Sequence, residues 1–260
     1  SDKNSDNFDS LFFVRRDIEK IEIPAWIKHI KSYALAGCLK LSSIQFSEDS
    51  QLVSIEKFAF EFSGIKTIVI PKHVKRMDEF TFSNCFCIEN IEFAENSELC
   101  SFNNNLFFNS TIHRLVGPSS LIEMKDDWCA SVPCLYEFHI PECNKHFKSF
   151  NGNLVLGKSD PNSQNYDVLV FASRRVDSGL ISPSIKIIKP YAFSHCENLK
   201  NVFSPENSEL VSIGHGAFSS STIESICIPT HVKMLGLGAL YDCSNLKRIT
   251  NLWEVDFSIG

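Results

Sequence analysis

The sequence predicts a curved α/β solenoid that carries a parallel sheet on one face, is built from stacked turns of alternating 23 and 24 residues, and is interrupted once by a β-hairpin. Two observations support this prediction. A short apolar segment recurs at nearly constant spacing, and Phe, Cys and Ser recur at fixed distances behind it. Each turn of a solenoid must rise by the same amount to cover the apolar edge of its neighbour, so such constant spacing is typical of this fold.

Composition and charge narrow the classes of partner. Apolar residues make up 43% and charged residues 22% of the 260 residues, as in ordinary folded proteins. The formal net charge of −6 disfavours a nucleic acid partner, because the phosphate backbone attracts basic surfaces. No segment approaches the roughly 20 consecutive apolar residues that span a bilayer, so we expect no membrane insertion within this chain.

The recurring segment sets the register of the turns. Ile21–Pro24 returns as Ile68–Pro71 and Ile226–Pro229, and a second version, first seen at Phe46–Ser50, alternates with it. The register residues, each at the start of a predicted strand, are Ile21, Ile44, Ile68, Ile91, Leu115, Phe138, Gly179, Val202, Ile226 and Ile249. They are 23 or 24 residues apart, except for one step of 41 residues between Phe138 and Gly179.

Two further columns of residues support this register. An apolar spine lies fourteen residues after the register position in short turns and sixteen after it in long turns: Leu35, Phe60, Phe82, Phe107, Phe193, Phe218 and Leu240. Three residues later stand small side chains suited to a tight buried turn: Cys38, Ser63, Cys85, Ser110, Cys196, Ser221 and Cys243. Each turn is therefore predicted to contain a strand, an extended return, and one helical or 3₁₀ turn around its Ala-Phe pair.

One pattern of residues resembles a known repeat family. The pattern Ile-x-Ile-Pro-x-x-Val-x-x-Ile-x-x-x-Ala-Phe-x-x-Cys-x-x-Leu-x-x-Ile, followed from Ile226 to Ile249 and from Ile21 to Ile44, is similar to the BspA-like (Treponema pallidum type) leucine-rich repeat. The resemblance implies a leucine-rich-repeat solenoid of the kind found on bacterial surface proteins and in trichomonad and entamoeba families. It also implies adhesion to host or matrix proteins, and no catalytic residues. The turn that begins at Leu115 departs from the pattern, with Trp128-Cys129 in place of Ala-Phe.

The register divides the chain into five segments. Residues 1–20 are predicted to be an N-terminal cap or the remnant of an earlier repeat, and residues 21–141 are leucine-rich repeats. Residues 142–178 are an interrupted repeat with a hairpin insertion, and residues 179–250 are again leucine-rich repeats. Residues 251–260 are a C-terminal cap or a cut end.

The interruption is predicted to form a β-hairpin with a mobile tip. Its two apolar runs, Leu154–Leu156 and Val168–Phe171, are separated by residues 157–166, which are rich in Ser, Asp, Pro and Asn. Insertions of this kind project from one face of a solenoid, where they either shape the binding region or are neutral decoration.

An exposed strip on the sheet is the predicted protein-binding site. Alternate strand residues point to opposite faces, so the residue after each register residue faces solvent. In the later turns these residues are mostly apolar, and they form the predicted strip Val116, His139, Leu180, Phe203 and Cys227. Exposed apolar strips usually mark a contact. Cover by the hairpin and self-association are the two alternatives to partner binding.

No catalytic or metal site is predicted, and no cofactor. Cys143-x-x-His146 has the spacing of half a zinc site, but no second pair of ligands accompanies it. An enzyme would need His113, His139 or Cys143 to converge in a pocket at the hairpin. A column of lysines in the short turns is either a solvated charge ladder or a groove for acidic ligands: Lys28, Lys75, Lys186 and Lys233.

The sequence therefore predicts a non-enzymatic protein-recognition module that acts in surface adhesion to host or matrix proteins. The alternative is an intracellular scaffold or assembly component that binds other protein subunits. The resemblance favours the cell surface or secretion. The ten Cys residues contain no CxxC pair, and many of them sit in repeat columns, which agrees better with a reducing compartment such as the cytoplasm.

Overall fold

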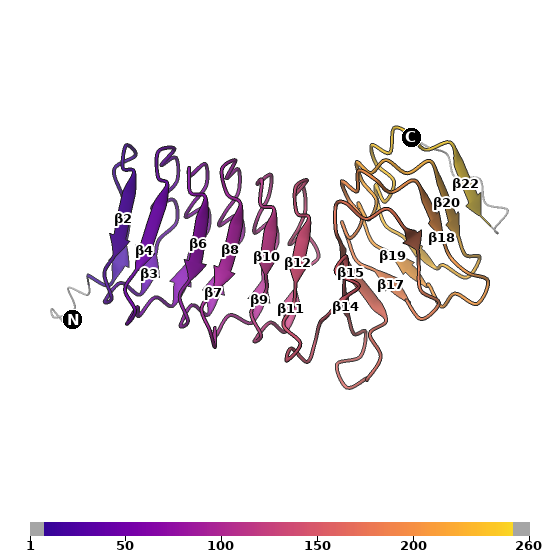
Figure 1. The fold of residues 1–260 in the computed structure, drawn as a ribbon, viewed down its shortest axis with the longest axis horizontal. Coiled ribbons are helices and arrows are strands. Elements are labelled where there is room, and N and C mark those ends of the chain that lie inside the picture. Colours follow the sequence, from indigo (N-terminus) through magenta and orange to yellow (C-terminus); the bar gives the residue numbers. More distant parts are fainter. Residues whose placement is uncertain (1–7, 252–260) are drawn as a thin grey trace, which may run out of the picture. The chain divides into compact units, whose positions relative to one another are not determined.

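The structure is a computed structural model that describes residues 8–251. The predictions for residues 1–7 and for the C-terminal cap or cut end after Asn251 lie outside the described residues. The chain separates into two compact units, residues 1–145 (unit 1) and residues 146–260 (unit 2). Figure 1 shows that each unit is a stack of strand-bearing turns, and the described residues contain 22 β-strands and no α-helix.

The first strand of every turn contains the predicted register residue. In unit 1 these strands are β2 (Lys20–Ile23), β4 (Ser43–Phe46), β6 (Thr67–Ile70), β8 (Asn90–Phe93), β10 (Arg114–Val116) and β12 (Glu137–His139). In unit 2 they are β16 (Gly179–Leu180), β18 (Asn201–Phe203), β20 (Ser225–Ile228) and β22 (Arg248–Asn251). All their ladders are parallel, in the sheet orders β2-β4, β12-β10-β8-β6 and β16-β18-β20-β22. The solenoid with a parallel sheet on one face is thereby confirmed.

The extended return of each turn forms a second set of short strands. In unit 1 these are β1 (Ser10–Leu11), β3 (His29–Ile30), β5 (Ser54–Ile55), β7 (Arg76–Met77), β9 (Ser101–Phe102) and β11 (Glu123–Met124), in the orders β1-β3-β5-β7 and β11-β9. In unit 2 they are β13 (Lys148–Phe150), β14 (Leu154–Gly157), β15 (Val168–Ala172), β17 (Ile187–Ile188), β19 (Ser212–Ile213) and β21 (Met234–Leu235), in that order within one sheet. The core lies between the two sets of strands.

The helical turn predicted around each Ala-Phe pair is replaced by consecutive tight turns. The N–H of Leu35 donates to the carbonyl of Ala59 in the next turn at 2.9 Å, and the N–H of Phe60 donates to the carbonyl of Thr81 at 3.0 Å. These amides point along the solenoid axis rather than back along their own turn, which excludes the i to i−4 bonds of a helix. Residues in the left-handed backbone conformation, such as Phe58 with a φ of 60°, reverse the direction of the chain at these tight turns.

Stacked rings of the predicted spine form the centre of the core. The rings of Phe60 and Phe82 lie 5.0 Å apart at 14°, and those of Phe193 and Phe218 lie 5.1 Å apart at 5°. Trp128 is buried and packs 5.0 Å from the ring of Phe138, which explains how the turn that lacks Ala-Phe still fills the core. Such offset ring pairs add stability beyond the area that they bury.

The small-residue column is a chain of hydrogen bonds between turns. The hydroxyl of Ser63 lies 3.5 Å from the Sγ of Cys85, which donates to the carbonyl of Phe60 at 3.0 Å. Ser221 and Cys243 repeat the pair at 3.6 Å. Burial raises the pKa of the Cys85 thiol to about 12, so this cysteine stays protonated and serves as a structural hydrogen-bond donor.

Ser110 is the member of this column whose hydroxyl is buried without a partner among residues 8–251. The next turn places Val132 where a cysteine would stand. We expect Ser110→Ala to raise the free energy of unfolding by about 1 kcal/mol, because a buried hydroxyl without a partner carries a desolvation cost. Ser63→Ala, which removes a hydroxyl that has a partner, should lower it by about 1 kcal/mol. Urea unfolding of both variants measures the difference, and a destabilised Ser110→Ala would contradict this explanation.

The interruption forms the predicted hairpin, but it belongs to the return strands. β14 pairs antiparallel with β15, β13 adds a third antiparallel strand through a turn at Asn151–Gly152, and β15 pairs in parallel with β17. The hairpin therefore extends the return sheet of unit 2. It does not cover the predicted strip, since Leu180 remains 66% exposed, and the alternative of hairpin cover is wrong.

The base of the hairpin loop is held by a buried carboxylate. Asp167 accepts hydrogen bonds from the backbone N–H of Ser159 at 2.8 Å and from its hydroxyl at 2.7 Å, and it pairs with Lys186 at 3.2 Å. Burial by itself would raise the pKa of Asp167, but these donors outweigh it and lower the pKa. Any mobile part of the tip must therefore lie beyond Ser159.

Candidate functional site

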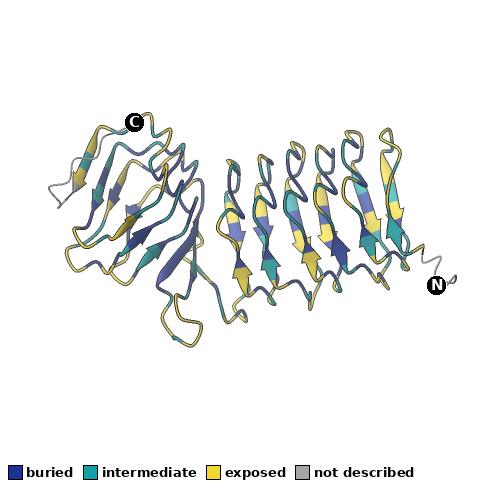
Figure 2. Cartoon of the chain, turned by 180° about the vertical axis from the view of Figure 1, so that it is seen from behind, coloured by how far each residue is buried: buried dark blue, intermediate teal, exposed yellow. Residues whose placement is uncertain are grey.

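The predicted strip residues all lie on the open face of the register strands. Leu180 is 66% exposed and Phe203 is 53% exposed, His139 is exposed, and Val116 and Cys227 are half-buried. The alternation of the strands explains this, because the register residue before each of them is buried. Figure 2 shows the same alternation of exposed and buried positions along the strands.

The five residues belong to two separate sheets. Val116 pairs with His139 between β10 and β12 of unit 1, and Leu180 pairs with Phe203 between β16 and β18 of unit 2. Cys227 follows Phe203 in register on β20. No ladder joins β12 to β16 within the described part of the chain. The predicted strip residues therefore lie in two sheets, one in each unit, and we call Leu180, Phe203 and Cys227 the unit 2 strip.

The backbones of β16 and β18 approach each other closely at the first strand of the unit 2 strip. A Cβ atom at Gly179 would lie 2.1 Å from the carbonyl oxygen of Asn201 on β18. Gly is therefore required at this register position, where the other turns have a larger apolar residue. The glycine places Leu180 directly beside Phe203 with its side chain toward solvent.

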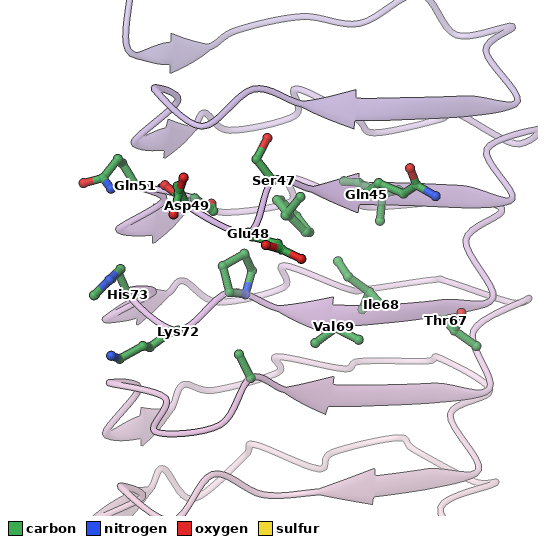
Figure 3. Close-up of a pocket in the computed structure, with 15 residues that line it drawn as sticks. Gln45, Ser47, Glu48, Asp49, Gln51, Thr67, Ile68, Val69, Lys72 and His73 are labelled. Carbon is green, nitrogen blue, oxygen red and sulfur yellow. Dashed lines mark hydrogen bonds between the residues drawn. The ribbon is translucent and has the colours of Figure 1, made fainter.

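Unit 1 has an open cavity on its sheet face, lined by both polar and apolar groups, that the sequence analysis did not predict. It has a volume of about 680 Å³ and lies between the long-turn loop Ser47–Ser50 and the shorter segment Pro71–His73, as Figure 3 shows. Gln45 and Val69 border it from neighbouring strands. The alternation of long and short turns is the sequence signal that could have indicated it.

Charged groups beside this cavity form an exposed ion-pair network. The Nδ1 of His73 lies 2.6 Å from one carboxylate oxygen of Glu98, and the Nζ of Lys75 lies 3.4 Å from the other. Hydrogen bonding from His73, more than from Lys75, lowers the pKa of Glu98. A carboxylate shared between two such groups at the surface is typical of surface ion pairing rather than of a catalytic base.

A second cavity of about 550 Å³ lies farther along the same sheet face of unit 1. Val116, Arg114 and Cys143 border it. His113 instead stacks on the ring of Tyr136 at 5.6 Å. The structure therefore does not bring His113 to Cys143 at this cavity, as the enzyme alternative requires.

The lysine column is largely neutralised within the chain. Lys28 lies 3.8 Å from Asp9, Lys75 lies 3.4 Å from Glu98, and Lys186 lies 3.2 Å from Asp167. These pairs favour the charge-ladder interpretation over a groove for acidic ligands. Within residues 8–251, no group of three or more His, Cys, Asp or Glu side chains is placed to hold a metal ion, and no helix has the length and apolarity to cross a membrane.

Comparisons with known proteins agree with this geometry. The chain resembles the crystal structure of the pneumococcal vaccine antigen PcpA, with 21% identity and a TM-score of 0.75 over 90% of this chain and 62% of that one. It resembles a leucine-rich repeat protein from Eubacterium ventriosum, with 21% identity and a TM-score of 0.77 over 92% and 62% of the two chains. A leucine rich cell surface protein from Faecalibacterium prausnitzii has 16% identity and a TM-score of 0.56 over 91% and 80%.

The likeness to these structures shows the shared fold, and the chain spans 62% of the length of the first two. A search of curated proteins gives no match. The model of the BspA type leucine rich repeat region matches six copies over residues 7–132 and 169–255. This match covers most of the chain and leaves out residues 133–168, which include β14 and the hairpin loop. The protein therefore belongs to the BspA type leucine-rich repeat family.

Proposed function

We propose that the protein is a non-enzymatic recognition module that binds a protein partner through the unit 2 strip. The observation that carries this proposal is the exposure of Leu180 and Phe203 on neighbouring strands, with Cys227 beside them. An apolar strip on an open sheet face favours association, because its contact with a partner removes apolar area from water. Family and fold, which are typically non-enzymatic, support a protein-interaction role.

More specifically, we propose that this recognition module acts in adhesion to host or matrix proteins at a cell surface. Among the similar structures, one is named a pneumococcal vaccine antigen and another a leucine rich cell surface protein. Both names are compatible with display outside the cell. A partner met there would contact Val116 and His139 of unit 1 only if its surface also reaches that sheet.

The cysteines favour a second candidate, an intracellular scaffold that binds other protein subunits. All ten lie within the described residues, and none forms a disulfide in the structure. Ten thiols outside disulfides are typical of a reducing compartment. Titration of free thiols separates the candidates when the protein is purified from its natural cells and then denatured. Ten reactive thiols favour the scaffold, and fewer than ten, with the rest in disulfides, favour the cell surface.

The strip is tested by a charge placed at its centre. We expect Phe203→Glu to weaken binding to immobilised matrix proteins and to host cells by at least about tenfold, because a buried unpaired carboxylate costs more than 1.4 kcal/mol at an interface. Val69→Glu is the matched control, since Val69 is also 53% exposed at the same strand position in unit 1. If both variants bind as the parent does, the unit 2 strip is not the contact surface.

A further inference from the structure

The two cavities of unit 1 are copies of one site. Each lies where a long turn is followed by a short one, and the residues that border the first recur around the second 47 residues later. The equivalent pairs include Phe46 and Phe93, Glu48 and Glu95, and Pro71 and Pro118. The repeat of the solenoid therefore sets the distance between the two cavities.

That distance follows from the strand ladder. The first cavity is bordered by β6 and the second by β10, and β8 pairs in parallel with both strands. Neighbouring strands lie about 4.8 Å apart, so two steps place equivalent points of the cavities about 9.5 Å apart. A ligand whose own side chains repeat at this distance fits both cavities at once.

The first cavity combines apolar walls with free carboxylates. Phe46 and Pro71 border it, and Glu48 and Asp49 stand exposed on its long-turn loop, facing the segment that carries Lys72, as Figure 3 shows. Within residues 8–251, no basic side chain forms a salt bridge with either carboxylate. With Lys72 counted, the cavity keeps an excess of negative charge.

The second cavity repeats this combination. Pro118 borders it together with Glu92 and Glu95, which are exposed and form no salt bridge in the described part of the chain. Arg114 also borders this cavity, but its guanidinium lies 3.3 Å from the carboxylate of Glu137. A side chain with an apolar stem and a cationic end, that is Lys or Arg, complements both cavities.

We propose that the two cavities bind a basic peptide in the polyproline II conformation, with Lys or Arg side chains three residues apart, one in each cavity. A polyproline II helix has three residues per turn and rises about 3.1 Å per residue, so residues i and i+3 project from one side about 9.3 Å apart. A β-strand presents side chains on one face at about 6.8 Å or 13.6 Å, and neither distance matches. Pro-rich segments dock into aromatic-lined grooves by this presentation. The site shares no residue with the unit 2 strip and is a binding site beyond the proposed function.

Fluorescence anisotropy of two labelled octapeptides with the full chain tests the spacing. The probe Pro-Pro-Arg-Pro-Pro-Arg-Pro-Pro carries its arginines three residues apart. Its isomer Pro-Pro-Pro-Arg-Arg-Pro-Pro-Pro has the same charge and the same number of prolines. We expect the probe to bind at least about fivefold more tightly than the isomer, because only the probe fills both cavities at once.

Removal of charge at equivalent positions tests the cavities themselves. Glu48→Gln and Glu95→Gln should each weaken binding of the probe about threefold, and the double variant about tenfold, since each change removes one partner of an ion pair. Glu206→Gln is the matched control, because Glu206 is exposed at the same place of a long turn in unit 2, and it should bind the probe as the parent does. Circular dichroism checks that all variants fold.

Three results would overturn the proposal. The first is no binding of the probe at millimolar concentration, and the second is equal binding of the probe and its isomer. The third is a probe affinity that the double variant leaves unchanged. An Ala-rich helical peptide with two arginines seven residues apart, which repeats at about 10.5 Å, should bind no better than the isomer. Binding of this helix as tight as that of the probe would contradict the polyproline II conformation.

Discussion

Replacing Phe60 by Ala should lower the free energy of unfolding by about 3–5 kcal/mol, the range for large buried aromatic side chains. Phe60 is fully buried, and its ring stacks on that of Phe82 at 5.0 Å. The truncation leaves a cavity inside a spine whose neighbouring turns are held apart by backbone ladders, so the site has little freedom to collapse. Urea unfolding followed by circular dichroism measures the loss.

Phe86→Ala is the control for this prediction, because Phe86 belongs to the same unit but is 54% exposed. Surface changes of this kind usually alter stability by less than about 0.5 kcal/mol. Since each turn of a solenoid contacts mainly its neighbours, we expect the Phe60 defect to broaden the unfolding transition as well as to shift it. Equal losses for the two variants would refute the stacked spine as the main source of stability.

Gly179→Ala should destabilise the protein by at least about 1–3 kcal/mol, as overpacking of a tight contact does. The new methyl group would meet the carbonyl oxygen of Asn201 at 2.1 Å, and backbone atoms cannot rotate away as a flexible side chain can. We therefore expect β16 to separate from β18. Thermal unfolding and amide exchange of Leu180 and Ile181 report this separation.

The neighbouring residue provides the control for Gly179→Ala. Leu180 is 66% exposed on the same strand, so Leu180→Ala should change the free energy of unfolding by less than about 0.5 kcal/mol. If Gly179→Ala is as mild as Leu180→Ala, the close approach of β16 and β18 is not a constraint on the sequence.

The register of the fold could be predicted because the repeats constrain it many times over. The sequence aligned Ile21 with Ile44 and Leu115 with Phe138, and both pairs face each other in the ladders. The same numbering predicted which strand residues face solvent. A one-residue error would have exchanged buried and exposed positions in every turn, so each repeat tests the prediction again.

The path of the chain between strands could not be predicted in the same way. The Ala-Phe pairs have helix-compatible residues, but Phe58 lies in the left-handed region and the amide of Phe60 bonds to the next turn. Local propensity is overridden there by hydrogen bonds to residues about 21 positions away, Phe60 to Thr81. Single-turn patterns carry no information on such contacts.

The assignment of the strip residues to two sheets has a comparable cause. Sequence spacing placed Leu180 next after His139, but 41 residues separate the register residues of their turns. Within unit 2, those intervening residues build β13, β14 and β15, whose last strand starts a new return sheet. The antiparallel pairing of β14 with β15 decides this arrangement, and hairpin composition alone does not reveal which sheet the hairpin joins.

Because most cysteines of the small-residue column are buried, the rates at which their thiols are modified report local opening of individual turns. Cys38, Cys85 and Cys196 of this column are buried, and so is Cys129 outside it, whereas Cys87 is exposed. The thiolate is the nucleophile that attacks an alkylating reagent, so a buried thiol is modified only while its turn is open to water. The order in which these thiols become alkylated would show the order in which the turns of the native protein open locally.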